Sequence, residues 1–239
     1  MKITNPDDIF TNRSGIGTLK EKSLHAELIE WFAKPGDKLE SNISGYIIDI
    51  LQDNILIEIQ IKNFSAIKNK LFTLCKDYPI RLIHPIAGQK WIIKVAANGE
   101  RISRRKSPKK GRIEEVFYEL IHITNLLSNP NLSVWVAMAD IEEIWLNDGK
   151  GSWRRKNWSI IDRHLLEVVE IMEFNRPKDY IQVLPNSLPK TFTNNDVANS
   201  LGISKPLSRK ITYCLRKMNE VTIVRKQGRE YQFSMVNNS

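Results

Sequence analysis

The sequence predicts an α/β (α+β) protein in which a mixed central β-sheet is flanked by helices and a small domain follows at the C-terminal end. The chain has 239 residues, of which 41% are hydrophobic, so it can bury a substantial core. Apolar runs typical of strands and helices occur in the order strand, strand, helix, strand, strand. This order favours a mixed sheet with helices packed on it.

The distribution of charge predicts two domains. The net charge is +9, and from Asn175 onward eleven Lys and Arg residues stand against four Asp and Glu residues. A basic surplus concentrated in one segment is typical of a module that binds a polyanion. We therefore expect a first domain over residues 1–174, with its core in 23–95, and a basic second domain over residues 175–239.

The composition limits the possible sites and locations. Two cysteines are too few for a disulfide framework, and four scattered histidines form no closely spaced pair, so a histidine-zinc site is not expected. No apolar run approaches the ~20 residues that span a bilayer, and the N-terminus lacks the apolar core of a signal peptide. The sequence predicts a reduced cytoplasmic protein with no membrane partner.

A first helix is expected over residues 23–32. Ser23 can cap it, and Leu24 and Leu28 begin an apolar stripe with helical spacing. Glu27 falls on or beside this stripe, so its carboxylate is expected near whatever the helix packs on. Glu30 is an equally placed acidic neighbour.

Two strands, residues 46–51 and 55–61, are expected to form a hairpin. A two-residue turn at Asp53-Asn54 is plausible because both residues tolerate positive φ. The isoleucines of the second strand then share one face and pack on a helix. The other face carries Glu58, and this turn places Asp49 directly opposite it.

The middle of the chain continues the alternation of strands and helices. We expect helices over residues 65–78, 113–127 and 159–174, strands over 80–86 and 91–96, one or two strands within 133–146, a solvated loop over 101–112, a glycine-rich hairpin tip over 147–158, and a short extended segment over 180–184. The 101–112 loop carries seven positive residues and no negative one, which suits either a solvated linker or a DNA contact.

The last segment resembles a winged helix-turn-helix. A helix over residues 191–203 can open at Thr193 with Asp196 in the capping-box position, a second helix covers 205–220, and 221–235 alternates like a two-stranded wing. Cations on the outer face of the second helix suit phosphate contacts. The expected DNA-binding residues are Lys205, Ser208, Arg209, Lys210, Arg216, Lys217, Arg225, Lys226 and Arg229, with Arg104, Arg105, Arg154 and Arg155 from the first domain.

The opposed acids at Asp49 and Glu58 indicate a metal site. Directly opposed side chains lie ~4.5–5.5 Å apart, and like charges there are destabilising. A divalent cation offsets that repulsion, because hard cations such as Mg²⁺ take carboxylate oxygens and keep waters and substrate phosphate as further ligands. An ordinary solvent-exposed sheet face with alternating charges is the competing interpretation.

Asp49 followed by Glu58-x-Gln60, with Glu27 on the preceding helix and Lys62 and Lys68 close behind, resembles the PD-(D/E)XK nuclease superfamily. The resemblance covers roughly residues 23–95 and implies a restriction-endonuclease-like mixed sheet flanked by helices. It also implies Mg²⁺ or Mn²⁺ as cofactor.

The resemblance implies a role for each residue of this site. Asp49, Glu58 and the carbonyl of Ile59 would be metal ligands, and Glu27 would hold a metal through water or help to order the site. Gln60 stands where the family usually has lysine, so the positive charge must come from Lys62, which periodicity favours slightly, or from Lys68 or Lys70 on the next helix.

The expected function is that of an enzyme, a metal-dependent DNA endonuclease or nickase that leaves a 5′-phosphate, with duplex DNA held by the C-terminal winged helix. A non-catalytic DNA-binding regulator that keeps the nuclease fold is the alternative. A third hypothesis is that the protein is a subunit of a larger DNA-processing complex. A homodimer is plausible if both strands are cut.

Overall fold

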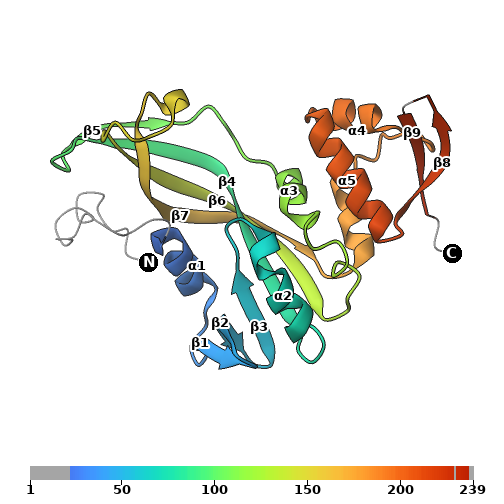
Figure 1. The fold of residues 1–239 in the computed structure, drawn as a ribbon, viewed down its shortest axis with the longest axis horizontal. Coiled ribbons are helices and arrows are strands. Elements are labelled where there is room, and N and C mark those ends of the chain that lie inside the picture. The colour runs from blue at the N-terminus through green and yellow to red at the C-terminus, as the bar shows by residue number, and fades with distance from the viewer. Residues whose placement is uncertain (1–21, 229, 237–239) are drawn as a thin grey trace.

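The computed structural model describes residues 22–228 and 230–236, and Figure 1 shows the arrangement of their elements. The strands of the large sheet are β1 (Lys38–Ile43), β2 (Tyr46–Gln52), β3 (Ile55–Ile59), β4 (Ile80–Val95), β5 (Arg101–Lys106), β6 (Leu132–Leu146) and β7 (Ser159–Phe174). The helices around it are α1 (Lys22–Phe32), α2 (Phe64–Leu74) and α3 (Phe117–Leu120), with 3₁₀ helices η2 (Ile113–Val116), η3 (Trp153–Arg155) and η4 (Pro177–Val183). None of the described helices is long and apolar enough to cross a membrane.

The seven-stranded sheet is mixed, as expected. Its strand order is β1-β2-β3-β4-β6-β7, and β5 pairs with the far half of β4. The central strands β3, β4 and β6 run parallel, whereas the β1–β2, β2–β3, β4–β5 and β6–β7 pairs are antiparallel. Helix α2 forms the connection from β3 to β4, because two parallel strands cannot be joined by a tight turn.

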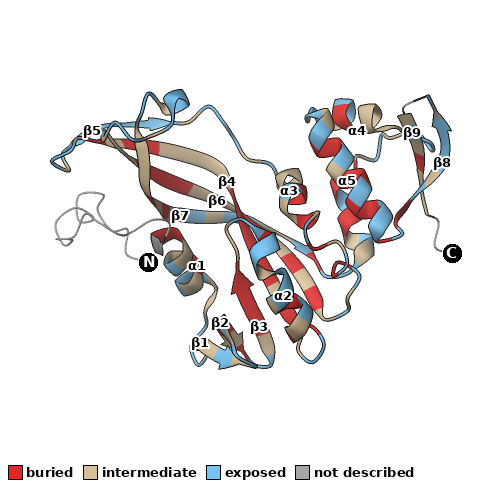
Figure 2. Ribbon diagram, in the orientation of Figure 1, coloured by how far each residue is buried: buried red, intermediate tan, exposed pale blue. Residues whose placement is uncertain are grey.

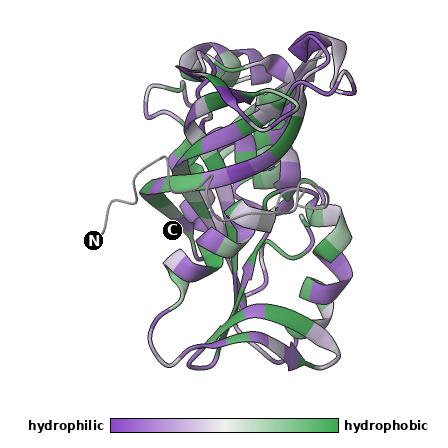
Figure 3. Cartoon of the chain, turned by 90° about the vertical axis from the view of Figure 1, so that its left-hand side faces the viewer, coloured by the Kyte–Doolittle hydropathy of each residue, from purple (hydrophilic) through white to green (hydrophobic). Residues whose placement is uncertain are grey.

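Helices cover both faces of this sheet, which confirms the predicted fold class. Leu24 and Leu28 of α1 pack with Ile57 and Ile59 of β3 on one face. On the other face, α2 and the η2–α3 segment pack against a second buried cluster that includes Leu56. Buried residues of the central strands divide between these two clusters, so β3 is buried over most of its length (Figure 2). Hydrophobic and hydrophilic residues are interleaved along the strands (Figure 3). The isoleucine face of β3 packs on a helix as predicted.

Residues 159–174, predicted to be a helix, form strand β7. The apolar residues come in adjacent pairs that imitate a helical stripe. The register with β6 skips Ile161, Leu166 and Val169, the second member of three such pairs. Each skipped residue is a β-bulge that resets the alternation of side chains, so the sequence lacks the period of two expected for a strand.

Other elements also differ from their predictions. The two strands expected at 80–86 and 91–96 are one strand, β4, because the chain continues through a bulge at Gly88, which the register with β6 skips. Residues 101–106 form β5 rather than a loop, although all six side chains are exposed. The helix expected over 113–127 is shorter and is limited to η2 and α3. The segment 180–184, expected to be extended, falls largely in η4, and strand β1 was not predicted.

The C-terminal segment contains α4 (Asn194–Leu201), α5 (Lys205–Lys217) and the antiparallel pair β8 (Val221–Gln227) and β9 (Glu230–Met235). Thr193 and Asp196 form the predicted capping box, and Gly202 ends α4 with a left-handed φ of 64°. The order of two helices and a hairpin agrees with the prediction, and its identification as a winged helix stays a prediction.

The C-terminal segment shares its core with the sheet. Tyr180 of η4 stacks on Phe174 of β7 with ring centroids 4.4 Å apart. Ile211 and Leu215 of α5 belong to the same buried cluster as Phe117 of α3. The segment is therefore held against α3 and the end of β7, as Figure 1 shows at the right of the molecule.

Candidate functional site

The hairpin of β2 and β3 opens at the two acidic residues. Its register pairs Gln52 with Ile55 and Ile50 with Ile57, which confirms the predicted turn; Asp53 has a φ of 52°. Pairing ends one position before Asp49 and Glu58. There the Asp49 carboxylate accepts a hydrogen bond from the Ile59 backbone N–H at 2.7 Å. The Asp49 carboxylate thus takes the place of the backbone carbonyl that a continued pairing of β2 and β3 would supply, and the two strands separate at this point.

Glu58 is buried beneath α2 and held by a lysine. Its Oε2 lies 2.5 Å from the ammonium nitrogen of Lys70, which also donates to the carbonyl of Ile47. Burial and the nearby charge of Asp49 raise the pKa of Glu58 to about 7, although the hydrogen bond and charge of Lys70 oppose this rise. The two carboxylates therefore lie within electrostatic reach of each other, and the lysine only partly neutralises them.

His25 of α1 approaches the same point from the opposite face. Its Nε2 lies 3.1 Å from the carbonyl oxygen of Ile59 and 3.3 Å from Asp49 Oδ2. The hydrogen bond to Asp49 raises the pKa of His25, and the charge of Glu58 adds to that rise against the cost of burial. No pattern in the sequence links His25 to this site, because only the packing of α1 on the sheet brings it to Asp49.

The lysine favoured by periodicity is not the one against Glu58. Strand β3 ends at Ile59, so the alternation that favoured Lys62 stops before it, and the Lys62 side chain is exposed. Lys68 is also exposed, two residues before Lys70 and so on a different side of α2. Lys70, the remaining alternative, places its ammonium group against Glu58. Gln60 donates to the Lys62 carbonyl at 2.5 Å, and its own carbonyl accepts from His84.

Glu27, which the resemblance implied would hold a metal through water or help to order the site, is turned toward β7. Its two oxygens accept hydrogen bonds from His164 Nδ1 at 2.7 Å and from the Leu165 N–H at 2.6 Å. His164 also contacts Asp162, and this pair of acids raises the pKa of His164 to about 9. The hydrogen bonds of Glu27 therefore connect α1 to strand β7 of the sheet.

Several atoms of the kinds that bind divalent cations lie near this point. Two carboxylates, the Ile59 carbonyl and an imidazole nitrogen supply oxygen and nitrogen donors, and such cations use one or two carboxylates with waters and substrate oxygens as further ligands. Within the described ranges, no group of three or more His, Cys, Asp or Glu is placed to hold a metal ion. Any cation at this point thus depends on the peptide carbonyl as well as on side chains.

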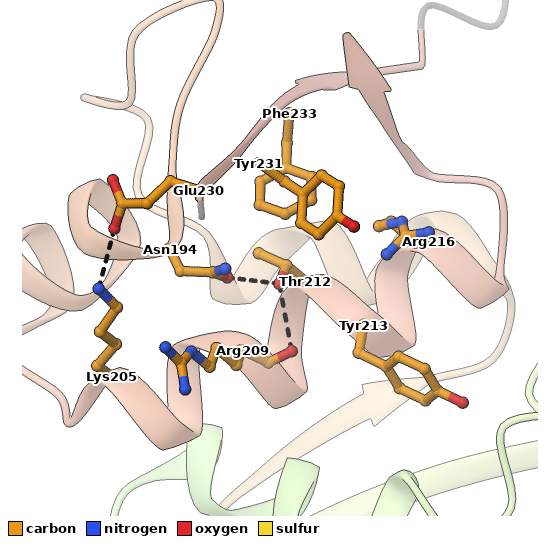
Figure 4. Close-up of a pocket in the computed structure, with 9 residues that line it drawn as sticks. All are labelled: Asn194, Lys205, Arg209, Thr212, Tyr213, Arg216, Glu230, Tyr231 and Phe233. Atoms are coloured by element: carbon orange, nitrogen blue, oxygen red, sulfur yellow. Dashed lines mark hydrogen bonds and ion pairs between the residues drawn. The ribbon is translucent and has the colours of Figure 1, made fainter. Parts of the chain in front are cut away.

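A second candidate surface is a hollow of about 500 Å³ between α5 and β9. Arg209, Tyr213 and Arg216 line it from one exposed stripe of α5, and Tyr231 lines it from β9 (Figure 4). Lys205 also lines it, although its ammonium nitrogen lies 2.9 Å from Glu230 Oε1. Three of the predicted DNA-binding cations therefore share one concave surface with three aromatic rings, because Phe233 also lines it.

Ser208 is not available for DNA binding, contrary to prediction. It is fully buried, with a relative exposure of 0%, and its hydroxyl donates to the Lys205 carbonyl at 3.0 Å. Its position in the helix repeat places it on the side of α5 that faces the core. Lys210 lies over the ring of Tyr118 at 5.5 Å, so it is directed toward α3 rather than toward the hollow.

The remaining predicted cations are dispersed. Arg104 forms an ion pair with the buried Glu142 at 2.6 Å, and Arg105 is exposed on β5. Arg154 lies over Trp153, and Arg155 donates to the carbonyl of Trp158. Lys217 is exposed near Tyr213, Arg225 donates to Gln232, and Lys226 lies over Tyr231. Arg229 lies outside the described residues.

Comparison with known proteins places the sheet domain in a family. A family model with the description "Domain of unknown function (DUF8091)" matches residues 22–175. An uncharacterized protein of Treponema pallidum (strain Nichols) is 30% identical over 186 residues, which cover 77% of this chain and 74% of that protein. No solved structure gives a significant match. The family match ends one residue after β7, so α4, α5, β8 and β9 lie beyond it.

Proposed function

Since this chain belongs to the DUF8091 family through residues 22–175, we propose a function from the side chains of that region: a metal-dependent DNA endonuclease or nickase. The observation that carries the proposal is the convergence of Asp49, Glu58, the Ile59 carbonyl and Lys70 where β2 and β3 separate. Glu58 is buried beside Asp49, and Lys70 only partly offsets the cost of burying this carboxylate, so the arrangement is costly for stability.

Each residue has a distinct part in the proposed hydrolysis. Asp49, Glu58 and the carbonyl of Ile59 would hold Mg²⁺ or Mn²⁺, which supplies Lewis-acid polarisation of the phosphodiester when bound. Lys70 places a positive charge at the acid pair, where it can stabilise the charge that develops on phosphorus and its oxygens. A water oxygen bonds to phosphorus, the P–O3′ bond breaks, and the 3′ oxygen takes up a proton.

The hollow beside α5 is the proposed DNA-binding surface. Arg209 and Arg216 present charged groups to a concave surface that Tyr213 and Tyr231 also line. Phosphate contacts by such cations fix the position of a duplex without reading its sequence. Since α5 shares a buried cluster with the sheet domain, this surface is held in a constant position relative to Asp49 and Glu58.

Plasmid cleavage tests the proposal. Purified protein is incubated with supercoiled plasmid and Mn²⁺ or Mg²⁺, and EDTA is added to parallel samples. We expect conversion to nicked or linear DNA that stops with EDTA and falls at least ~100-fold in Asp49→Asn, because a ligand of the reacting centre is lost. Glu30→Gln is the matched control, because Glu30 is an exposed acid on α1. Equal cleavage by wild type and Asp49→Asn would refute the nuclease and leave the non-catalytic DNA-binding protein.

A further inference from the structure

The hollow beside α5 presents positive charge that the fold does not neutralise. Arg209 and Arg216 lie about two turns apart on the exposed stripe of α5, and both line the hollow. In the described part of the chain, neither guanidinium forms a hydrogen bond or an ion pair. Lys205, by contrast, is paired with Glu230 at 2.9 Å. The net positive charge of the hollow therefore comes from the two arginines, whose planar groups suit phosphate.

Two exposed tyrosine rings accompany these charges. Tyr213 follows Arg209 by one turn of α5 and is 43% exposed, and Tyr231 of β9 is 39% exposed. The ring of Phe233 lies 6.4 Å from that of Tyr231 and 6.0 Å from that of Phe192, measured between centroids. Phe233 and Phe192 are buried, so Tyr231 lines the hollow with a ring that the core supports (Figure 4).

Phosphate contacts with a duplex do not account for these rings. A duplex meets a protein with its phosphates and with the edges of its bases, because the faces of paired bases are covered by their neighbours in the stack. Only a base that has left the stack can lie on an aromatic ring, and cations beside aromatic rings are typical of proteins that bind single strands. The volume of about 500 Å³ lies within the ~300–1,000 Å³ typical of pockets for small ligands, which is enough for one nucleotide.

The hollow also has a polar side that suits the edge of a base. The buried Thr212 hydroxyl donates to Asn194 Oδ1 at 2.7 Å, which leaves the NH₂ group of Asn194 to donate to an acceptor on a base. Glu230 lies at the opposite end of the hollow from Arg216 (Figure 4). Its negative charge disfavours phosphate at that end, so the phosphates of a bound strand are expected toward Arg216.

We propose that this hollow binds an unpaired nucleotide next to a DNA duplex, with its base on Tyr231 and its neighbouring phosphates against Arg209 and Arg216. The inference rests on the proposed function, because it uses the same DNA-binding surface. It names the preferred substrate class of that surface, which is DNA with a single-stranded segment rather than a blunt duplex.

Fluorescence anisotropy of the intact protein tests the inference with three labelled DNAs. These are a blunt duplex, the same duplex with a short thymidine tail, and the same duplex with a tail of equally many abasic nucleotides. The two tails carry the same number of phosphates, so the difference in their affinities measures the bases alone. We expect the thymidine tail to bind about 5–150-fold more tightly than the abasic tail, which corresponds to the stacking of one base.

Variants of Tyr231 locate the base. Tyr231→Leu should reduce the preference for the thymidine tail to less than about twofold, whereas Tyr231→Phe should retain it, because phenylalanine keeps the ring face. Tyr118→Leu is the matched control and should also retain the preference. Tyr118 is likewise 39% exposed, but it lies outside the hollow, with Lys210 over its ring.

The outcomes separate this inference from the proposed function. Equal binding of the thymidine and abasic tails would overturn the inference and leave duplex binding through phosphates standing. If the wild type binds none of the three DNAs, both the inference and the proposed DNA-binding surface are refuted. A clear preference for the thymidine tail without any plasmid cleavage supports the inference and contradicts only the nuclease. The wild-type comparison of the two tails decides the matter even if Tyr231→Leu unfolds, which circular dichroism melting shows.

Discussion

The ammonium nitrogen of Lys70 on α2 lies 2.5 Å from Glu58 Oε2 on β3. This contact joins a helix to the acid pair and supplies the positive charge that Gln60 cannot.

Lys70→Met should lower metal-dependent plasmid cleavage by about 100-fold or more, because a preorganised charge at the reacting centre is removed while the length of the side chain is kept. Lys68→Met and Lys62→Met are controls on neighbouring exposed lysines and should cleave within about threefold of the wild type. Initial rates of plasmid nicking measure all three. A loss in Lys62→Met with normal cleavage by Lys70→Met would return the role to the lysine favoured by periodicity.

The contacts of His164 should make stability depend on pH. Hydrogen bonds from His164 to Asp162 and Glu27 raise its pKa from 6.5 to about 9, so the folded protein holds this proton more tightly than the unfolded chain. The stabilisation is fully present below pH 6.5 and is lost as the pH rises through about 9. His164→Gln should therefore cost roughly 3 kcal/mol at pH 6 and much less at pH 10, measured by urea unfolding. An equal cost at both pH values would show that the charge of His164 is unimportant.

Arg209→Ala and Arg216→Ala should each weaken duplex DNA binding and make it less sensitive to salt. Each phosphate contact that is lost reduces the slope of log Kd against log salt by about one. Fluorescence anisotropy of a labelled duplex at several salt concentrations measures both quantities. Lys38→Ala, an exposed lysine of β1, is the control. If the wild type shows no salt dependence, the hollow beside α5 does not bind a nucleic-acid backbone.

Gly111→Ala should destabilise the protein by about 1–3 kcal/mol, which is the usual cost of overpacking. A Cβ atom at Gly111 would lie 2.5 Å from the Ala87 carbonyl oxygen and 2.7 Å from Ile86 Cγ2. Gly111 also donates to that carbonyl at 2.8 Å, so the segment after β5 cannot move away without losing a hydrogen bond. Gly88→Ala, whose nearest new contact would be 3.5 Å, should change stability little. Urea unfolding of both variants compares them, and equal stability would show that the segment is loosely held.

Local patterns determined the elements around the site. Apolar spacing in α1 and α2, the turn residues Asp53 and Asn54, and the capping box at Thr193 each depend only on neighbouring residues, so they could be predicted. The register of β2 and β3 follows from the turn, and with it the positions of Asp49 and Glu58.

The predictions of secondary structure that were wrong concern segments whose conformation depends on pairing with a strand distant in sequence. The bulges of β7 opposite β6 and the bulge of β4 at Gly88 depend on a partner strand, so the alternation visible in the sequence is interrupted there. Residues 159–174 consequently imitate a helix. The exposed β5 is a strand because β4 offers an edge to pair with, and neither its composition nor its charge predicts this.

Local sequence patterns were enough to predict the mixed sheet flanked by helices, the opposed acids of the hairpin, and the basic character of the last segment. The contacts of Lys70 with Glu58, of Glu27 with β7 and of His25 with Asp49 are visible only in the folded protein. Turns and periodicity act between residues close in sequence. The packing of a helix on a sheet, by contrast, decides which of its side chains face a site formed by other elements.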